Sequence, residues 1–332
     1  MTKLRWGVLG VAKIATEKVI PAMQRGQWTT VAAIASRDRA KADAAAAKLG
    51  IPTAYGSYEA LLADPNIDAV YIPLPNHLHA PWATRAAETG KHVLCEKPIA
   101  LNAAEARRLV EVRDRTSVQI QEAFMVRSHP QWLKALELVR DGQIGDLRSM
   151  LWHFSYFNAA PSNIRNILEF GGGGLMDIGC YLINTGRFIF GREPDRVMGV
   201  FDRDPVLRTD RMTSLLLDFG AGHLAGTCST QTVPYQRAHI FGTRGRIEIE
   251  IPVNAPPDRS SRLFVDRGTG VDTIELPICD QYTIQGDLFS RAILDGRPAP
   301  VPLEDAVANM ACIDAAFRSA ESGRWEEPRE LS

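Results

Sequence analysis

The amino-acid sequence predicts an α/β protein in which a doubly wound domain over residues 1–124 precedes an α+β domain over residues 125–332. Its length of 332 residues suits two domains of about 150 residues each. The first part alternates short β-branched apolar runs with amphipathic helical stretches, which is typical of βαβ units. The second part begins with helical patterns and then alternates polar and apolar residues, which indicates antiparallel strands.

Five runs in the first domain have the length and composition of buried strands. They are residues 4–10, 30–36, 69–73, 92–96 and 118–123. Helical patterns separate these runs. The clearest one, residues 39–49, is rich in alanine and lysine and ends at Gly50, a residue that commonly closes a helix.

The second domain combines helices with a strand-rich region that extends from residue 197 to residue 275. Helices are predicted over residues 131–140 and 175–190, and the strand candidates are 211–218, 223–232, 239–241 and 246–251. The segment Gly242-Thr243-Arg244-Gly245 has turn composition. Two further helices are expected over 284–295 and 303–322.

Composition excludes several classes of protein. The net charge is -1, so no global field recruits nucleic acid or an anionic membrane. The apolar runs fall far short of the ~20 residues of a membrane span, and the first residues lack a signal-peptide pattern, so we expect a cytoplasmic protein. The cysteines are odd in number and scattered, which predicts reduced thiols and no metal site: Cys95, Cys180, Cys228, Cys279 and Cys312.

The first predicted strand leads directly into a dinucleotide-binding fingerprint. Aligned on G-x-G-x-x-G/A, the key positions are Gly10, Ala12 and Ala15, with Lys13 and Ile14 also expected at the cofactor. Gly10 would make the tight turn, and the N-terminus of the following helix would hold the phosphates. The second position is alanine instead of glycine, which weakens the match. The alternative is therefore a tight turn that binds no ligand.

The end of the second predicted strand favours NADP over NAD. NAD-binding proteins usually place an acidic residue there, whereas this chain has Ser36 and Arg37. A hydroxyl followed by a guanidinium suits a 2′-phosphate, and Lys41 is a possible helper. The alternative is a solvated helix start with Ser36 or Asp38 as its N-cap.

Two segments follow strands at the edge where a parallel sheet binds its ligand. One contains Pro73, Leu74, Asn76 and His79, with Asn76 also a candidate N-cap. The other is Glu96-Lys97-Pro98, in which the proline holds the lysine in an extended conformation. A lysine there could take part in acid–base chemistry. The alternative for Lys97 is an exposed surface amine.

A third segment begins with the glycine run 171–174 and continues into a helix. The glycines would let a ligand approach the first turn closely. Asp177 and Tyr181 are four residues apart and share one helix face, so both could address one substrate. The alternative is that Tyr181 is a core aromatic residue and Asp177 a helix-start carboxylate.

Together these motifs resemble the Gfo/Idh/MocA family of oxidoreductases. The resemblance covers nearly the whole chain and implies a Rossmann domain followed by a domain with an open, mostly antiparallel sheet. Many members carry D-x-G-x-H-x-x-D, where this chain has Asp177, Gly179, Tyr181 and Asn184. The tyrosine is similar to the branch with glucose-fructose oxidoreductase, aldose-aldose oxidoreductases, NADP-dependent xylose dehydrogenase and dimeric dihydrodiol dehydrogenase.

The resemblance also implies a reaction. Tyr181 would be the general base, Lys97 would assist it and orient the sugar, and Asp177 would bind a hydroxyl. Oxidation of an aldose at C1 by NADP would give a lactone, and a tightly held cofactor could be re-oxidised by a second sugar. The alternatives are a keto-sugar reductase, a trans-dihydrodiol dehydrogenase or, in another class, a non-catalytic NADP-binding sugar sensor.

Further residues are expected at the cleft or at the cofactor. Polar candidates for the substrate cleft are Arg127, His129, Asn158, Asn163 and Arg165. Arg165 and Tyr55 are also expected to bind the cofactor, and by the resemblance Tyr282 lies near the nicotinamide. An open sheet with an uncovered face tends to pair with a second copy, so a homodimer is expected.

Overall fold

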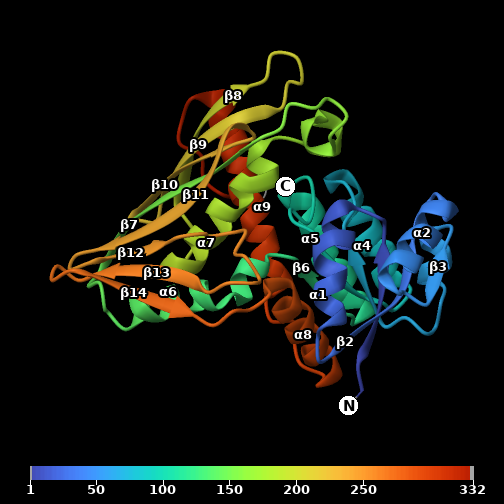
Figure 1. Cartoon of the computed structure of the whole chain (residues 1–332). Coiled ribbons are helices and arrows are strands. Elements are labelled where there is room, and N and C mark those ends of the chain that lie inside the picture. The colour runs from blue at the N-terminus through green and yellow to red at the C-terminus, as the bar shows by residue number, and fades with distance from the viewer. Residues whose placement is uncertain (1, 330–332) are drawn as a thin grey trace. The chain divides into compact units, whose positions relative to one another are not determined.

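The computed structural model describes residues 2–329, which form two compact units (Figure 1). The first unit contains the chain up to Met125 together with Asp280–Val307, and the second contains Val126–Cys279 and the chain from Ala308 onward. The sequence pattern predicts a single division after residue 124. The fold departs from it because a later helix, α8 (Gln281–Leu294), packs on the first sheet, where Phe289 and Trp6 have ring centroids 5.8 Å apart.

The first unit is built on a six-stranded parallel sheet with the order β3-β2-β1-β4-β5-β6. This is the strand order of doubly wound dinucleotide-binding domains. The strands are β1 Leu4–Leu9, β2 Thr29–Ala35, β3 Thr53–Tyr55, β4 Ala69–Ile72, β5 His92–Cys95 and β6 Ile120–Glu122. The five expected strands are confirmed, whereas the three half-buried residues of β3 carry no recognisable pattern.

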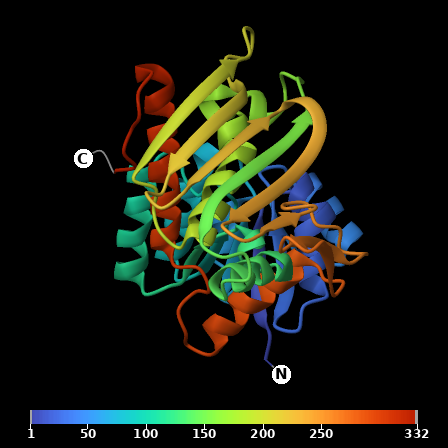
Figure 2. The ribbon, with the colours of Figure 1, turned by 90° about the vertical axis from the view of Figure 1, so that its left-hand side faces the viewer.

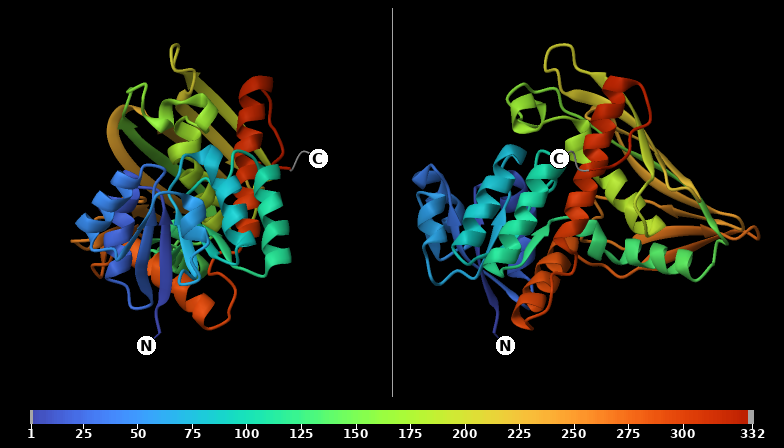
Figure 3. Two further views of the ribbon diagram at one scale, coloured as in Figure 1. Left: turned by 90° about the vertical axis from the view of Figure 1, so that its right-hand side faces the viewer. Right: turned by 180° about the vertical axis from the view of Figure 1, so that it is seen from behind.

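Helices flank this sheet, as the left-hand view of Figure 3 shows. A π-helical segment, η1 (Ala15–Val19), continues directly into α1 (Ile20–Gln24) after the first strand. The helix α2 ends at Gly50 in the left-handed conformation, as predicted. The remaining helical elements of the unit are α2 Arg39–Leu49, α3 Tyr58–Leu62, η2 Asn76–Leu78, α4 His79–Glu88 and α5 Ala103–Thr116.

The second unit contains an eight-stranded sheet with the order β14-β13-β12-β11-β7-β10-β9-β8. All neighbouring strands are antiparallel except β7 and β10, so the expected mostly antiparallel sheet is confirmed. The strands are β7 Leu147–Phe157, β8 Arg196–Arg203, β9 Asp210–Asp218, β10 His223–Ser229, β11 Gln231–Gly242, β12 Arg246–Ile249, β13 Ser261–Asp266 and β14 Val271–Leu276.

One face of this sheet is covered and the other is open. Alternate side chains such as Met150, Trp152 and Phe154 of β7 are buried on the covered face, where α6 and α7 lie in Figure 1. Within the described part of the chain, no helix covers the face of strands β7 to β11 that is turned to the viewer in Figure 2. The helical elements are η3 Met125–Ser128, α6 Pro130–Arg140, η4 Ile164–Asn166, η5 Leu168–Phe170, η6 Leu175–Gly179, α7 Cys180–Phe190 and α9 Leu303–Ser322, of which η3 and α9 begin at residues that belong to the first unit.

Among the described residues 2–329, no helix combines the length and apolar character needed to cross a bilayer.

Candidate functional site

The turn after β1 has the backbone that a dinucleotide-binding loop requires. Gly10 has a φ of 122°, which L side chains rarely adopt, and its N–H donates to the carbonyl of Ala35 at 2.9 Å. A Cβ at this position would lie 3.1 Å from a methyl group of Leu74. Position 10 therefore favours glycine for two reasons: the turn needs a positive φ, and a side chain would crowd Leu74. Lys13, by contrast, is exposed and pairs with Glu17 at 3.8 Å.

The end of β2 presents one exposed guanidinium beside a buried hydroxyl. Ser36 is buried, and its Oγ accepts a hydrogen bond from the backbone N–H of Asp38 at 3.1 Å. Arg37 is exposed. Burial raises the pKa of the nearby Tyr58 hydroxyl, while the charge of Arg37 and a hydrogen bond from it lower that pKa. This arrangement could hold a phosphate on the adenosine ribose.

The alternative of a helix N-cap is also realised, but by Asp38. Its Oδ1 accepts from the backbone N–H of Lys41 at 3.3 Å, and its carboxylate lies 3.7 Å from the Lys41 ammonium. Because Asp38 provides the N-cap, Arg37 is not needed for capping. A helix start at Asp38 and a phosphate site at Arg37 are therefore compatible. Tyr55, another expected cofactor residue, donates its hydroxyl to Asp64 at 2.7 Å.

His79 joins the segments that follow β4 and β5. Its two ring nitrogens lie 2.6 Å from the Leu74 carbonyl and 2.7 Å from the Pro98 carbonyl. Burial lowers the pKa of His79 to about 4. In the structure His79 therefore acts as a buried link between the two loops. Asn76 begins the short helix η2, whose N-cap position is Pro75, so the expected capping role of Asn76 is wrong.

The carboxylate of Glu96 is held at the end of β5. Its Oε1 accepts a hydrogen bond from the Tyr71 hydroxyl at 2.6 Å, and its Oε2 accepts from the backbone N–H of Lys97 at 3.3 Å. The Lys97–Pro98 peptide bond is cis. Tyr282 on α8 is mostly buried, and burial together with the negative charge of Glu96 raises the pKa of its hydroxyl. Sequence reasoning missed Tyr71, whose only signal is a hydroxyl in an apolar strand.

In the second unit, Asp177 lies in η6 and Tyr181 follows in the first turn of α7. Tyr181 is buried, with 4% of its surface exposed, and its carbonyl accepts from the Thr185 hydroxyl at 2.8 Å. Asp177 accepts from the Tyr156 hydroxyl at 2.5 Å and from Arg165 Nε at 2.8 Å. Arg165 therefore contacts a predicted catalytic carboxylate, and its expected contact with the cofactor stays a prediction.

The glycine run is packed against the protein itself. A Cβ on Gly172 would lie 2.5 Å from the Arg165 carbonyl, and one on Gly173, whose φ is 123°, would collide with Oδ1 of Asp210. Asp210 is fully buried and accepts from the backbone N–H of Leu175 at 2.6 Å and from the Thr213 hydroxyl at 2.7 Å. Close packing around the start of η6 thus requires Gly172 and Gly173, and the expectation that the glycine run admits a ligand stays a prediction.

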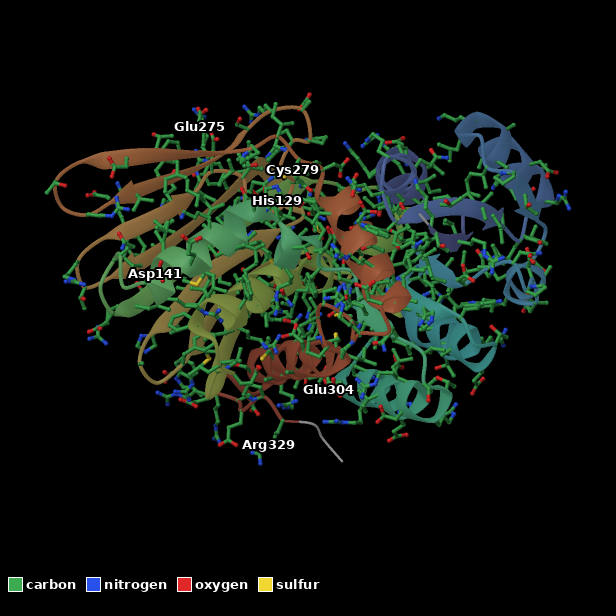
Figure 4. The ribbon with its side chains drawn as sticks, turned by 90° about the horizontal axis from the view of Figure 1, so that it is seen from below. His129, Asp141, Glu275, Cys279, Glu304 and Arg329 are labelled. Carbon is green, nitrogen blue, oxygen red and sulfur yellow. The ribbon has the colours of Figure 1, made fainter. Side chains whose placement is uncertain are left out.

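The other expected cleft residues have partners within the second unit. Arg127 stacks on Phe188, with its guanidinium carbon 4.5 Å from the ring centroid. Asn158 Oδ1 accepts from the backbone N–H of Ala160 at 3.0 Å, and Asn163 caps η4. His129 caps α6, and its Nε2 lies 3.6 Å from the sulfur of Cys279; Figure 4 labels both residues.

Comparison with known proteins identifies both parts of the chain. Residues 4–124 match the model described as "Oxidoreductase family, NAD-binding Rossmann fold", and residues 132–248 match the Gfo/Idh/MocA C-terminal domain. A D-xylose 1-dehydrogenase (NADP(+)) from Haloferax volcanii is 39% identical, and the match covers 96% of this chain and 98% of the relative.

Solved structures match over nearly the full length. An aldose-aldose oxidoreductase from Caulobacter crescentus, complexed with glycerol, has a TM-score of 0.91 and 28% identity, covering 98% of this chain and 99% of its own. A 3-ketoreductase from Actinomadura kijaniata, solved with NADP and TDP-benzene, has a TM-score of 0.90 and 29% identity, covering 96% and 98%.

Proposed function

The chain belongs to the Gfo/Idh/MocA family of oxidoreductases, and from that premise we propose that it oxidises an aldose at C1, with NADP as the hydride acceptor. The observation that carries the proposal is a tyrosine one turn beyond a carboxylate: Tyr181 follows Asp177 at the start of the helical segment η6–α7. The second requirement is Lys97, two residues after the end of β5 in the dinucleotide-binding sheet.

NADP is the cofactor, and the residues of the first unit fit it. Gly10 has the positive φ of the phosphate-binding turn, and Arg37 stands exposed after β2, where an acidic residue would repel a 2′-phosphate. The 39% identical xylose dehydrogenase is NADP-dependent, and the ketoreductase was solved with NADP. When bound, NADP supplies the hydride acceptor.

Residues of this chain would accept the proton that the sugar hydroxyl loses and would orient the sugar. Tyr181 takes the proton of the hydroxyl that is oxidised, Lys97 assists by its charge, and Asp177 accepts a hydrogen bond from a neighbouring sugar hydroxyl. Loss of the C1 hydride and the hydroxyl proton converts an aldose into a lactone. A second sugar could restore the oxidised cofactor where NADPH stays bound, as the similarity to an aldose-aldose oxidoreductase suggests.

The solved ketoreductase supports the choice of these two residues. Its described variants replace one lysine with alanine or glutamate and one tyrosine with phenylalanine. The two replaced positions are as far apart in that chain as Lys97 and Tyr181 are in this one. The same relative supports a second candidate function, the reduction of a keto-sugar, in which Tyr181 would donate a proton to the carbonyl oxygen.

We also propose that the protein is a cytoplasmic homodimer that pairs through the open face of the second sheet. Cross-strand register places Val200, Ser214, Thr227 and His153 in one row on this face. Apolar side chains remain exposed there, and Val200 and Leu151 have 69% and 48% of their surfaces accessible. Exposed apolar patches of this kind mark association surfaces.

The proposed catalysis is tested by Lys97→Ala and Tyr181→Phe. We expect each substitution to lower kcat with the preferred aldose at least a hundredfold, because each removes a group from proton transfer. Binding of NADP, followed by fluorescence titration, should stay within about threefold of the parent. Lys48→Ala, at an exposed position of α2, is the matched control and should leave both unchanged. Parental turnover in either catalytic variant would contradict the proposed proton transfer, whereas NADP binding by the parent without turnover of any sugar would favour a non-catalytic sensor.

A further inference from the structure

Strand β4 carries a buried hydroxyl that the proposed proton transfer does not use. Tyr71 has only 1% of its surface exposed, in a strand whose other residues are alanine, valine and isoleucine. Its hydroxyl donates to Oε1 of Glu96 at 2.6 Å. Burial, reinforced by the negative charge of Glu96, raises the pKa of Tyr71 well above its ordinary value, so the hydroxyl keeps its proton and stays a donor.

The Glu96 carboxylate, which accepts the hydrogen bond from Tyr71, is only partly buried. Glu96 is half-buried, its Oε2 accepts from the backbone N–H of Lys97, and its charge acts on Tyr282 of α8. Because Tyr71 fixes one oxygen from inside the core, the carboxylate has little freedom to turn away from the carboxyl end of β5. Fixed charges in such partly desolvated places act more strongly than mobile surface charges.

Strand order places this carboxylate at the nicotinamide end of a bound dinucleotide. The ribose-recognising pair Ser36–Arg37 follows β2, on one side of the switch point between β1 and β4. A bound dinucleotide would cross this point, so its second nucleoside would be expected near the ends of β4 and β5. Glu96 follows β5 directly. The oxidised nicotinamide ring carries a positive charge that the reduced ring lacks, so a fixed anion there distinguishes the two forms.

We propose that Tyr71 is a positioning residue that fixes the Glu96 carboxylate beside the nicotinamide, where it favours binding of NADP⁺ over NADPH. The pair thereby tunes the reduction potential of the bound cofactor. This inference rests on NADP as the cofactor and is independent of which sugar the protein uses. Tyr71 acts only through Glu96 and contacts no reacting atom.

The test compares the dissociation constants of NADP⁺ and NADPH for the full-length protein without sugar. Glu96→Gln should weaken NADP⁺ about tenfold relative to NADPH, because the amide keeps the size and loses the charge. Tyr71→Phe should shift the same ratio about threefold in the same direction. A tenfold change in this ratio raises the two-electron potential of the bound cofactor by about 30 mV.

Ser290→Ala provides the matched control. It removes the buried acceptor of the Trp6 indole N–H, bonded at 3.0 Å in the same unit, without altering Glu96. Its NADP⁺/NADPH ratio should equal that of the parent. An unchanged NADP⁺/NADPH ratio in Tyr71→Phe, including equal weakening of both cofactor forms, would overturn the role of Tyr71. If Tyr71→Phe fails to fold, an unchanged ratio in Glu96→Gln would overturn the proposal by itself. Loss of sugar oxidation with these ratios intact would count only against the proposed reaction.

Discussion

Tyr156 donates its hydroxyl to Oδ2 of Asp177 across 2.5 Å, from strand β7 to the helical segment that carries Tyr181. The other carboxylate oxygen accepts from Arg165 Nε at 2.8 Å, in an ion pair whose acidic side chain is 12% exposed. A sugar hydroxyl that binds Asp177 must therefore share this carboxylate with two fixed donors. Such sharing selects the direction from which the hydroxyl can approach.

Arg165→Ala distinguishes a substrate-binding role from a cofactor-binding role. Because Arg165 pairs with Asp177, its removal takes one cationic partner from the carboxylate and should loosen the proposed sugar contact. We expect kcat/KM for the sugar to fall about tenfold to a hundredfold, the usual cost of a lost charged hydrogen bond. Steady-state kinetics and NADP titration measure the two effects. A large loss of NADP affinity with an unchanged sugar KM would instead favour the cofactor role.

Arg37→Ala tests the 2′-phosphate assignment. The exposed guanidinium beside Ser36 should contribute to NADP binding and not to NAD binding. We expect the dissociation constant of NADP to rise roughly tenfold to a hundredfold, which corresponds to a loss of about 1.4–2.8 kcal/mol in binding free energy, with little change for NAD. Tyr58→Phe should give a smaller shift in the same direction, because Tyr58 hydrogen bonds to Arg37. Equal losses for both dinucleotides would remove Arg37 from the 2′-phosphate site.

Gly173→Ala should destabilise the second unit. The added methyl group would collide with the Asp210 carboxylate at a residue whose φ is 123°. We expect a loss of about 2–4 kcal/mol in the free energy of unfolding. Thermal unfolding measures it, and Gly191→Ala is an informative comparison because its φ is also positive while a Cβ there meets no neighbour. Equal costs at the two positions would show that backbone strain, and not Asp210, explains the glycine.

Asp210 gives the stability a pH dependence of defined sign. Burial raises the pKa of Asp210 to about 6, so between the unfolded value of about 4 and this value the native state binds a proton that the unfolded state lacks. The contribution of Asp210 is therefore largest at low pH and is lost as pH rises through about 6. Relative to Asp210→Asn, the parent should gain about 1–2 kcal/mol between about pH 7.5 and pH 5. A difference that stays constant or has the opposite sign would contradict the raised pKa.

The doubly wound α/β domain and its cofactor end could be predicted because local rules determine them. Alternating apolar strands and helices indicate a parallel sheet, and Gly10 and Arg37 stand at fixed offsets from strand ends. The short β3 was missed because a three-residue edge strand has no periodicity. The return of α8 to the first unit could not be foreseen, since it depends on the long-range packing of Phe289 on Trp6.

Sequence motifs point only to the most recognisable members of the candidate site. Lys97, Asp177 and Tyr181 stand in motifs, whereas Tyr71, Tyr156 and Asp210 lie in strands whose sequences are unremarkable. The positioning residues become visible only through contacts between segments that are distant in the sequence. The glycine run 171–174 shows the same limit, because its pattern is compatible with ligand access and with tight packing.

The most direct test of the account is the appearance of NADPH absorbance when the purified protein is mixed with NADP⁺ and a panel of aldoses. We predict that at least one aldose reduces NADP⁺ with formation of the lactone, and that Tyr181→Phe abolishes this signal. No reduction with any aldose, together with oxidation of NADPH by a keto-sugar, would contradict aldose oxidation and establish the reductase alternative.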